Sequence, residues 1–466
     1  MSEFRREQDF LGEAEVPAEA YYGIQTCRAA QNFPVSGLHI PSVFNRAYAE
    51  IKKAAARAHR ELEALPPDQA DVIIQATDEI IAGDHEDQFI VDVFQAGAGT
   101  SHHMNVNEII ANRANEIMGG ELGQYDPIHP NDDVNKGQST NDTYPTAMRV
   151  AVLLLLPELA GELESLSDAF QEKAEDFAPV KKSARTHLQD AVPITLGQEF
   201  SGYAAALAHL SDSFATKASG LRKLGLGGTA AGTGLNTVPG YRERAISFLG
   251  EQTGLDLCPA ENMFEAMQSM APFVEFSGTL RTAATELGRI SNDLRLLSSG
   301  PTTGLGELDL PAVQPGSSIM PGKINPVVSE CMNMICFQII GNDTCISRAA
   351  GAGQMELNVM MPIINYNLLW SIQILTNGCR MLREKCVEGI QANAEQCRRH
   401  LHSTIGLATV LNPVIGYHAA AEVAKEAAET NRTIREIVME KEILTEEEFA
   451  KLIKKAVRPS DEPDTF

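Results

Sequence analysis

The sequence predicts a mainly α-helical protein organised around a bundle of long helices. Between Phe273 and Leu297, apolar residues recur at alternating spacings of three and four, which is the pattern of the seam of a supercoiled bundle helix. A second apolar series runs from Leu357 to Leu382. No stretch shows sustained alternation with period two, so we expect little β-sheet. Because such seams need partner helices, and long helices find some of them in neighbouring subunits, we expect a homo-oligomer.

The first 140 residues are expected to form a mostly helical N-terminal domain, residues 1–140. Residues 1–40 are mixed and rich in turn-forming residues. Helices are expected over residues 42–65, 68–82 and 105–118. Ser42 can cap the first of these helices, and Gly119 and Gly120 can end the third, because Gly is common just past a helix end.

Two further domains complete the predicted organisation. Residues 141–394 form the central domain of long helices, and residues 395–466 form a small C-terminal helical domain, because the apolar stripe weakens after about Ala394. Thr445 is expected to cap a last helix whose first turn is rich in Glu. The Pro-Ser-Asp-Glu-Pro segment 459–463 is expected to be disordered.

Composition and charge exclude several classes of partner. The net charge of -24, from 38 basic and 62 acidic residues, argues against nucleic acid and against an anionic membrane surface. The longest aliphatic run, Val150 to Leu156, is far shorter than the roughly 20 residues that span a bilayer. The N-terminus lacks the apolar core of a signal peptide, and eight cysteines occur without a Cys-x-x-Cys pair. We therefore expect reduced thiols, a cytoplasmic location, no zinc site and no required cofactor.

One polar loop, residues 314–326, is a candidate catalytic segment. It contains two glycines and three prolines, which exclude regular helix or strand, so we expect an exposed and mobile loop. It offers Ser317 or Ser318 as a nucleophile or base beside the cation Lys323, a combination that suits a substrate carrying carboxylates. A plain connector is the alternative. A phosphate-binding loop is excluded, because five residues separate the glycines where that motif has four, and isoleucine follows the lysine.

Three other stretches are dense in hydroxyl and amide groups: residues 97–105, 129–142 and 185–190. Such groups can hold carboxylate oxygens by neutral hydrogen bonds. Helix capping is the alternative for each stretch, because Ser, Thr, Asn and Asp favour N-caps. The pair His102-His103 could suggest a metal, but no third ligand follows at a recognisable spacing, so no metal site is predicted.

Together these stretches resemble the aspartase/fumarase superfamily, and the resemblance covers nearly the whole chain. Residues 316–326, Gly-Ser-Ser-Ile-Met-Pro-Gly-Lys-Ile-Asn-Pro, are similar to its specific signature loop. Three further segments resemble the aspartate ammonia-lyase (aspartase) branch more than the class II fumarase branch. They are Tyr-Tyr-Gly-Ile-Gln-Thr at 21–26, Gln-Ser-Thr-Asn-Asp at 138–142 and Glu-Leu-Asn-Val-Met at 356–360.

The resemblance implies a fold of three mostly helical domains, the middle one forming the core of a homotetramer, with active sites shared between subunits. It also implies elimination on a C4 dicarboxylate, L-aspartate to fumarate and ammonia. A serine base removes the weakly acidic C3 proton, and hydrogen-bond donors stabilise the resulting aci-carboxylate. No cofactor is implied, and activation by a divalent cation is an open alternative.

The family roles carry over residue by residue. Ser317 is implied as the general base, helped by loop N–H groups and Lys323, while Thr186 and His187 hold the α-carboxylate side and Glu330 fixes the charge and tautomer of that His. Lys323 and Asn325 would contact a substrate carboxylate, and Asn141 the amino group. The donors to the β-carboxylate would be Thr100, Ser139, Thr140 and Ser318.

Three positions depart from the family pattern. His103 stands where relatives usually have Asn, Thr302 where Arg is common, and Met361 where aspartases often carry Glu. These departures keep three alternatives open. They are a fumarase that expels water, a lyase for a related amino dicarboxylate, motivated by His103, and a structural or interaction protein on this scaffold, which the intact pair Ser317 and Lys323 disfavours.

Overall fold

The structure is a computed structural model and describes residues 3–457 of the 466. It is 63% helical and 8% strand, so the predicted mainly α fold with little sheet is confirmed. The chain divides into two compact units, each built from three segments. Unit 1 comprises Met1–Ala160, Asp212–Ala284 and Phe337–Thr376, and unit 2 comprises Gly161–Ser211, Thr285–Cys336 and Asn377–Phe466. The predicted domain boundaries after residues 140 and 394 stay a prediction.

The described helices and strands follow one another along the chain with these bounds. The helices are α1 (Ile24–Asn32), α2 (Ser42–Glu61), α3 (Pro67–Ala82), α4 (Thr100–Ile117), α5 (Thr140–Asp176), α6 (Leu196–Ala218), α7 (Tyr241–Thr253), α8 (Met263–Gln268), α9 (Ala271–Leu297), α10 (Val327–Ala350), α11 (Met361–Lys385), α12 (Ala394–Ser403), α13 (Asn412–Ile415), α14 (Tyr417–Thr430), α15 (Ile434–Glu440) and α16 (Glu446–Ala456). The strands are β1 (Phe4–Asp9), β2 (Gly12–Pro17), β3 (Lys181–Thr186), β4 (Gln189–Thr195), β5 (Lys223–Leu224), β6 (Cys258–Pro259), β7 (Leu308–Asp309) and β8 (Gln391–Ala392).

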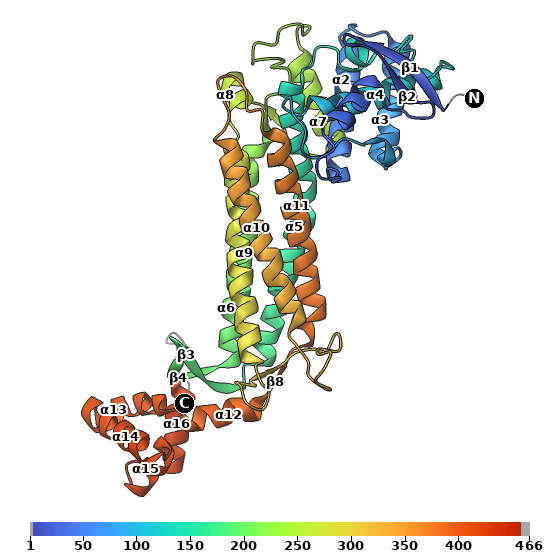
Figure 1. The fold of residues 1–466 in the computed structure, drawn as a ribbon. Coiled ribbons are helices and arrows are strands. Elements are labelled where there is room, and N and C mark those ends of the chain that lie inside the picture. Colours follow the sequence, from blue (N-terminus) through green and yellow to red (C-terminus); the bar gives the residue numbers. More distant parts are fainter. Residues whose placement is uncertain (1–2, 458–466) are drawn as a thin grey trace. The chain divides into compact units, whose positions relative to one another are not determined.

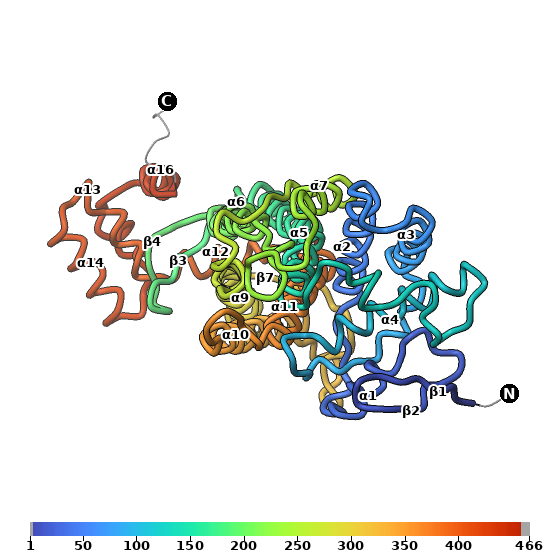
Figure 2. Tube along the Cα trace, turned by 90° about the horizontal axis from the view of Figure 1, so that it is seen from above, coloured from blue at the N-terminus to red at the C-terminus, as the bar shows by residue number. Residues whose placement is uncertain are grey.

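In unit 1, α2 packs against α3 and α7, and α4 packs against α1 and α3, beside the antiparallel pair β1–β2 (Figures 1 and 2). The three predicted helices are present, but α4 begins at Thr100, five residues earlier than expected, after Gly99 in the left-handed region. The prediction that Ser42 caps α2 is wrong. Pro41 occupies the cap position, and no side chain caps the helix there.

The predicted apolar series are buried. All eight members of the first series lie on α9 and are at most 5% exposed. In the second series, the members from Met361 to Leu382 lie on α11 and are buried, whereas Leu357 precedes that helix. Within unit 1, the neighbouring helices are tied by Ser277 on α9, which donates to Asp343 on α10 at 2.7 Å. The spacing of apolar residues therefore identified the core-facing side of both helices.

In unit 2, the other parts of α5, α6, α9, α10 and α11 lie beside the β3–β4 hairpin and the C-terminal helices α12 to α16 (Figure 1). The C-terminal helices enclose their own apolar core. As predicted, Thr445 caps α16, and it does so in a reciprocal capping box with Glu448. The segment 459–463, predicted to be disordered, lies outside the described residues. No helix among residues 3–457 is long and apolar enough to cross a membrane.

Candidate functional site

Unit 1 holds four of the predicted substrate-binding residues in one place. Thr100, Ser139, Thr140 and Asn141, here called the donor cluster, lie where α4 and α5 begin. The hydroxyls of Thr100 and Thr140 are 3.1 Å apart. Thr140 is buried, whereas Thr100 is exposed and lines a hollow of about 340 Å³. Because helix N-termini carry partial positive charge and unpaired N–H groups, this pair of helix ends is suited to an anion.

The carboxylate of Asp142 fixes the backbone of the donor cluster. It accepts hydrogen bonds from the N–H groups of Ser139 at 2.9 Å and of Gly227 and Thr229 at 3.0 Å. Burial raises the pKa of Asp142 to about 6, although these three hydrogen bonds act in the opposite direction. The adjacent Asn141 donates its side-chain N–H to the carbonyl of Ala230 at 2.8 Å. Because the amide nitrogen of Asn141 makes that bond, the side-chain oxygen faces away from Ala230 and is left as an acceptor. A substrate ammonium group requires such an acceptor.

A buried Lys–His pair lies behind the donor cluster, and sequence reasoning did not find its lysine. His103 on α4 places Nδ1 2.8 Å from Thr140 Oγ1 and Nε2 2.7 Å from Nζ of Lys52 on α2. Both side chains are at most 1% exposed. Burial and then the charge on Lys52 hold the pKa of His103 well below its ordinary value. Burial also holds the pKa of Lys52 well below its ordinary value, although the charge on Asp142 acts in the opposite direction. The sequence did contain a signal for this lysine. Lys52 lies inside an Ala-rich helix at a position in step with buried neighbours, which indicates a buried side chain.

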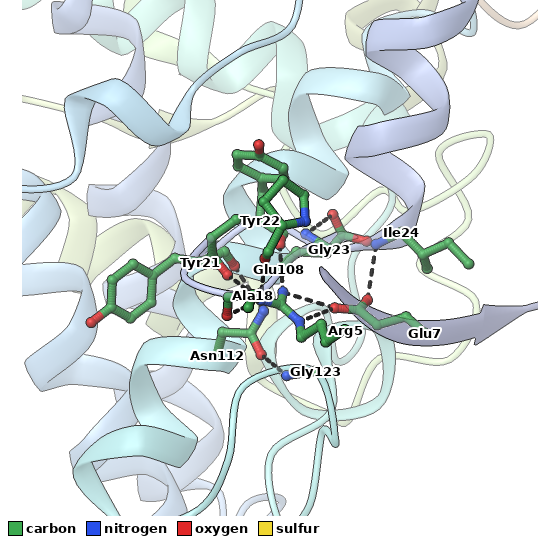
Figure 3. A network of polar contacts seen from close by, with 12 residues as sticks. Arg5, Glu7, Ala18, Tyr21, Tyr22, Gly23, Ile24, Glu108, Asn112 and Gly123 are labelled. Carbon is green, nitrogen blue, oxygen red and sulfur yellow. Dashed lines mark hydrogen bonds and ion pairs between the residues drawn. The ribbon is translucent and has the colours of Figure 1, made fainter. Parts of the chain in front are cut away.

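The aspartase-like segment 21–26 is joined by hydrogen bonds to Glu108 of α4, and Figure 3 shows Glu108 beside Gly23. The same helix carries Thr100 and His103. Glu108 on α4 accepts the backbone N–H groups of Gly23, Gln25 and Thr26, at 2.9 to 3.1 Å, so it caps α1 from outside. Burial raises the pKa of Glu108 to about 7 against the effect of these bonds. A side chain on Gly23 would collide with the Tyr125 hydroxyl, so only Gly fits there.

Unit 2 contains the signature loop, residues 314–326, which is irregular and mostly exposed as predicted. Ser317 Oγ accepts the backbone N–H groups of Ile319 at 3.2 Å and Met320 at 2.9 Å. Two N–H groups aimed at one hydroxyl oxygen would stabilise its ionised form. Asn325 donates to the carbonyl of Gly316 and closes the loop at its base. A side chain on Gly316 would meet the backbone of residues 323–325, so the closure needs Gly there.

Two hollows border the signature loop. The loop itself surrounds one of about 590 Å³, to which Ser317 and Lys323 contribute. A second, of about 320 Å³, is also lined by Lys323 and includes Asn325 and Asp309. Lys323 is exposed and lines both hollows, so it can meet an anion in either one.

Thr186 and His187 lie at the tip of the β3–β4 hairpin, also in unit 2. The strands pair Thr186 with Gln189, so His187 and Leu188 form a two-residue turn. Both have positive φ, 56° and 58°, a conformation that such turns usually assign to Asn or Gly. Left-handed backbone costs a non-glycine residue about 1 kcal/mol or more. The turn therefore stores strain while presenting an exposed imidazole, a combination typical of functional sites.

The hairpin is anchored by an ion cluster around the fully buried carboxylate of Glu307. Lys182 on β3 approaches this carboxylate at 2.7 Å and Arg185 at 2.9 Å, and His400 on α12 lies at 2.8 Å. Burial alone would raise the pKa of Glu307, but the hydrogen bonds and charges of Arg185 and Lys182 outweigh it and lower the pKa to about 2. The cluster fixes the strand that leads to His187.

Glu330 lies in the first turn of α10, 3.9 Å from Arg295 on α9. Among residues 3–457 of the single chain, no hydrogen bond or ion pair joins Glu330 to His187. That pairing stays a prediction, because the resemblance assigns it to a site shared between subunits. The structure thus collects the donor cluster in unit 1, and it places Ser317, Ser318, Lys323, Asn325, Thr186, His187 and Glu330 in unit 2.

Comparison with known proteins identifies the class of protein to which these features belong. Residues 12–341 match a family model described as lyase, and residues 407–456 match one described as the fumarase C C-terminus. An aspartate ammonia-lyase of Pseudomonas aeruginosa is 49% identical over 453 residues, which cover 96% of this chain and 95% of the relative. The aspartate ammonia-lyase of Bacillus subtilis is 46% identical, over 96% of this chain and 94% of its own. The chain therefore belongs to the aspartase/fumarase superfamily of lyases.

Solved structures agree with this assignment. A cobalt-bound structure described as a fumarate lyase:delta crystallin from Brucella melitensis has a TM-score of 0.95 and 49% identity, and the match covers 98% of this chain and all of that one. A class II fumarase from Schistosoma mansoni has a TM-score of 0.92 and 38% identity, over 97% of this chain and 98% of its own. The three-domain helical fold predicted from the sequence is thereby confirmed.

Proposed function

We propose that this protein is an aspartate ammonia-lyase, which converts L-aspartate reversibly to fumarate and ammonia. The observation that carries the proposal is the environment of Ser317, whose Oγ accepts two loop N–H groups, at 3.2 and 2.9 Å. A serine hydroxyl becomes a useful base only when its ionised form is stabilised, and preorganised N–H groups provide that stabilisation. Relatives named aspartate ammonia-lyase at 46–49% identity support the choice of substrate.

The reaction follows from these groups. Ionised Ser317 removes the proton from C3, and the C–H electron pair moves onto the β-carboxylate, which becomes an aci-carboxylate with two negative charges. Donors from Thr100, Ser139, Thr140 and Ser318 hold these oxygens as their charge grows. The electron pair then returns to form the C2–C3 double bond while the C2–N bond breaks and ammonia leaves, with Asn141 holding the amino group.

The remaining groups bind the substrate at its other end. Thr186 and His187 hold the α-carboxylate, Glu330 pairs with His187, and Lys323 with Asn325 contacts a carboxylate. In this scheme, hydrogen-bond donors and one lysine bind the substrate and stabilise the charge that develops. We therefore propose that no cofactor is required. Assaying the protein after dialysis against a chelator, with and without added magnesium, tests this proposal and activation by a divalent cation together.

We infer that the chain works as a homotetramer in which each active site combines segments of different subunits. Helix α10 supports oligomerisation, because Met334, Phe337 and Ile340 follow one another at intervals of three and are 63%, 67% and 37% exposed. A helix that exposes such a series in one chain has an apolar face available for partner helices. All eight cysteines are free thiols, which supports the cytoplasm as the location.

The proposal is tested by following fumarate formation by ultraviolet absorbance, with L-aspartate and L-malate supplied in parallel. Fumarate from aspartate alone is the expected result. Fumarate from malate alone would overturn the proposal in favour of a class II fumarase, which 38% identity to the Schistosoma enzyme keeps as the second candidate. Fumarate from neither would also contradict the proposal and would point to a related amino dicarboxylate.

A further inference from the structure

The Lys52 ammonium group faces three acceptors deep in unit 1. Its Nζ lies 2.7 Å from His103 Nε2 and 3.0 Å from the side-chain oxygens of both Asn135 and Gln138. The Lys52 side chain is 0% exposed. An ammonium group carries three hydrogens and accepts none, so these three acceptors match its hydrogen-bonding capacity.

The orientation of the two amide groups is fixed from their far sides. Asn135 donates its side-chain N–H to the carbonyl of Gln138 at 3.3 Å. Gln138 donates its own to the carbonyls of Val134 at 3.1 Å and Lys136 at 3.2 Å. Each amide therefore turns its oxygen, and not its nitrogen, towards Lys52. Because these oxygens take two of the three ammonium hydrogens, the third is directed at His103.

The hydrogen bond from Lys52 favours one tautomer of His103 over the other, in which the ring would donate to the Asn135 side chain. The ring is 1% exposed, stacks on Tyr48 at 5.2 Å between centroids, and lies beside the Lys52 charge, so it is neutral. A neutral imidazole that accepts a hydrogen bond at Nε2 carries its hydrogen on Nδ1. Nδ1 lies 2.8 Å from Thr140 Oγ1, so His103 donates to this hydroxyl.

The tautomer of His103 determines how the Thr140 hydroxyl is oriented. Its oxygen accepts from His103 Nδ1 at 2.8 Å and from the Thr100 hydroxyl at 3.1 Å, so its own hydrogen points away from both and is free to be donated. We propose that His103, held by Lys52, is a positioning residue that fixes the Thr140 hydroxyl as a hydrogen-bond donor to the substrate carboxylate. This inference rests on the proposed function, because it assumes that a carboxylate binds at the donor cluster.

The relay Lys52–His103–Thr140 also strengthens the hydroxyl as a donor. Hydrogen bonds in a chain polarise one another, and the charge on Asp142 favours the ammonium form of Lys52 at the start of this chain. The benefit is largest when the carboxylate gains its second negative charge, so the relay should affect the chemical step more than substrate binding.

A pair of substitutions at His103 separates donation from packing. His103→Leu removes the donor and keeps a buried apolar side chain, whereas His103→Asn is smaller but can still donate from a position close to that of Nδ1. We expect His103→Leu to lower kcat/KM for L-aspartate about 10- to 100-fold and His103→Asn to recover most of the loss, with both variants equally folded by circular dichroism. Equal activities of the two variants, or no loss in either, would overturn the proposal.

Non-additivity tests whether His103 acts through Thr140. Thr140→Val removes the hydroxyl that His103 is inferred to orient. We expect the double variant His103→Leu/Thr140→Val to be hardly slower than Thr140→Val alone, because the hydroxyl is already gone. Fully multiplied losses would show that His103 acts elsewhere and would contradict the inference. If His103→Leu does not fold, Lys52→Met takes its place in this cycle. This substitution removes the donor to His103 Nε2, so the unchanged ring is no longer held in one tautomer.

Binding of succinate, a C4 dicarboxylate that cannot eliminate ammonia, separates this inference from the proposed function. Calorimetry should show weaker succinate binding in His103→Leu and nearly wild-type binding in His103→Asn. If wild-type protein binds succinate but forms no fumarate from aspartate, the proposed function fails and the succinate affinities still decide the role of His103. Wild-type protein that binds no C4 dicarboxylate would overturn both. A gain in affinity in His103→Leu would show the opposite tautomer and contradict the inference.

Discussion

The donor cluster of unit 1 and the signature loop of unit 2 are held in opposite ways. Thr140 in the donor cluster is buried and contacts His103, which in turn contacts Lys52. Asp142 holds the backbone of the cluster, and each of these three residues makes two or more polar contacts. Ser317 in the loop receives its hydrogen bonds only from the loop's own backbone among the contacts found in residues 3–457, and the neighbouring Ser318 and Lys323 are exposed.

The difference matches the two tasks that the elimination sets. Charge that develops on a carboxylate is best stabilised by groups that cannot reorient, and a buried network provides such groups. A base must reach the substrate and also let the product leave, which favours a loop that can close and open. We therefore read the donor cluster as the rigid part of the chemistry and the signature loop as the movable part.

The largest effect is expected from Ser317→Ala in the movable part. Removing a general base costs about 10²- to 10⁴-fold in rate, and here no other group takes over the C3 proton, so we expect a loss at the upper end in kcat. Succinate binding and the oligomeric state should stay unchanged. Fumarate formation under saturating aspartate measures the effect, and a near-normal kcat would remove Ser317 from the mechanism.

The next effect is expected from Thr140→Val in the rigid part. Losing a hydrogen bond to a charged group costs about 1.5–3 kcal/mol, so kcat/KM for aspartate should fall by roughly 10- to 100-fold. Thr140→Ser keeps the hydroxyl and serves as the matched control, with a loss of only a few fold. If valine and serine gave the same rate, the hydroxyl would not be a donor to the substrate.

A stability effect is expected from Glu307→Gln, which tests how the hairpin of His187 is held. The pKa of Glu307 is lowered from 4.5 to about 2, which corresponds to roughly 3 kcal/mol of folding free energy. Because the folded pKa is the lower one, this stability is present above about pH 4.5 and is lost as the pH falls towards 2. Urea unfolding of wild type and variant should therefore differ near neutral pH and converge in acid.

The exposed Asp309, on strand β7 close to Glu307 in sequence, gives the control for that experiment. Asp309→Asn should leave the urea midpoint nearly unchanged at every pH. A Glu307→Gln protein as stable as wild type at neutral pH would show that the ion cluster does not hold the hairpin.

The smallest effect is expected from Leu188→Gly at the hairpin tip. Leu188 is 73% exposed and has a φ of 58°, so the glycine variant loses little packing and relieves backbone strain. Since glycine also makes the unfolded chain more flexible, the net gain should be at most about 1 kcal/mol. Thermal unfolding measures it, and a clear loss of stability would show that the turn is not strained.

Much of this architecture could be predicted from the sequence, because it depends on local patterns. The apolar spacing of residues 273–297 sets which face of α9 is buried, and the signature loop 314–326 is irregular because its glycines and prolines exclude helix and strand. Motif resemblance supplied the site residues, and the structure gathers Thr100 with Thr140 although 40 positions separate them.

The rest depends on contacts between segments far apart in the chain. The position of Lys52 in α2 is in step with buried neighbours, but only the fold shows that it meets His103, 51 positions away. Glu307 and Lys182 form their pair across more than a hundred residues, and nothing local marks either as buried. Ser42 failed as a cap because Pro41 took the cap position, which shows that a suitable residue does not by itself fix a helix start.

Mixing two impaired variants tests most directly the claim that the rigid and movable parts meet in sites shared between subunits. Ser317→Ala and Thr140→Val chains are co-expressed with different affinity tags, hybrid oligomers carrying both tags are isolated, and fumarate formation from aspartate is measured. If each site takes the donor cluster and the loop from different chains, about a quarter of the sites in an equal mixture have both parts intact, so the hybrids should recover up to about a quarter of wild-type activity. Hybrids no more active than the two parents would contradict the account, because every site would then contain one defect.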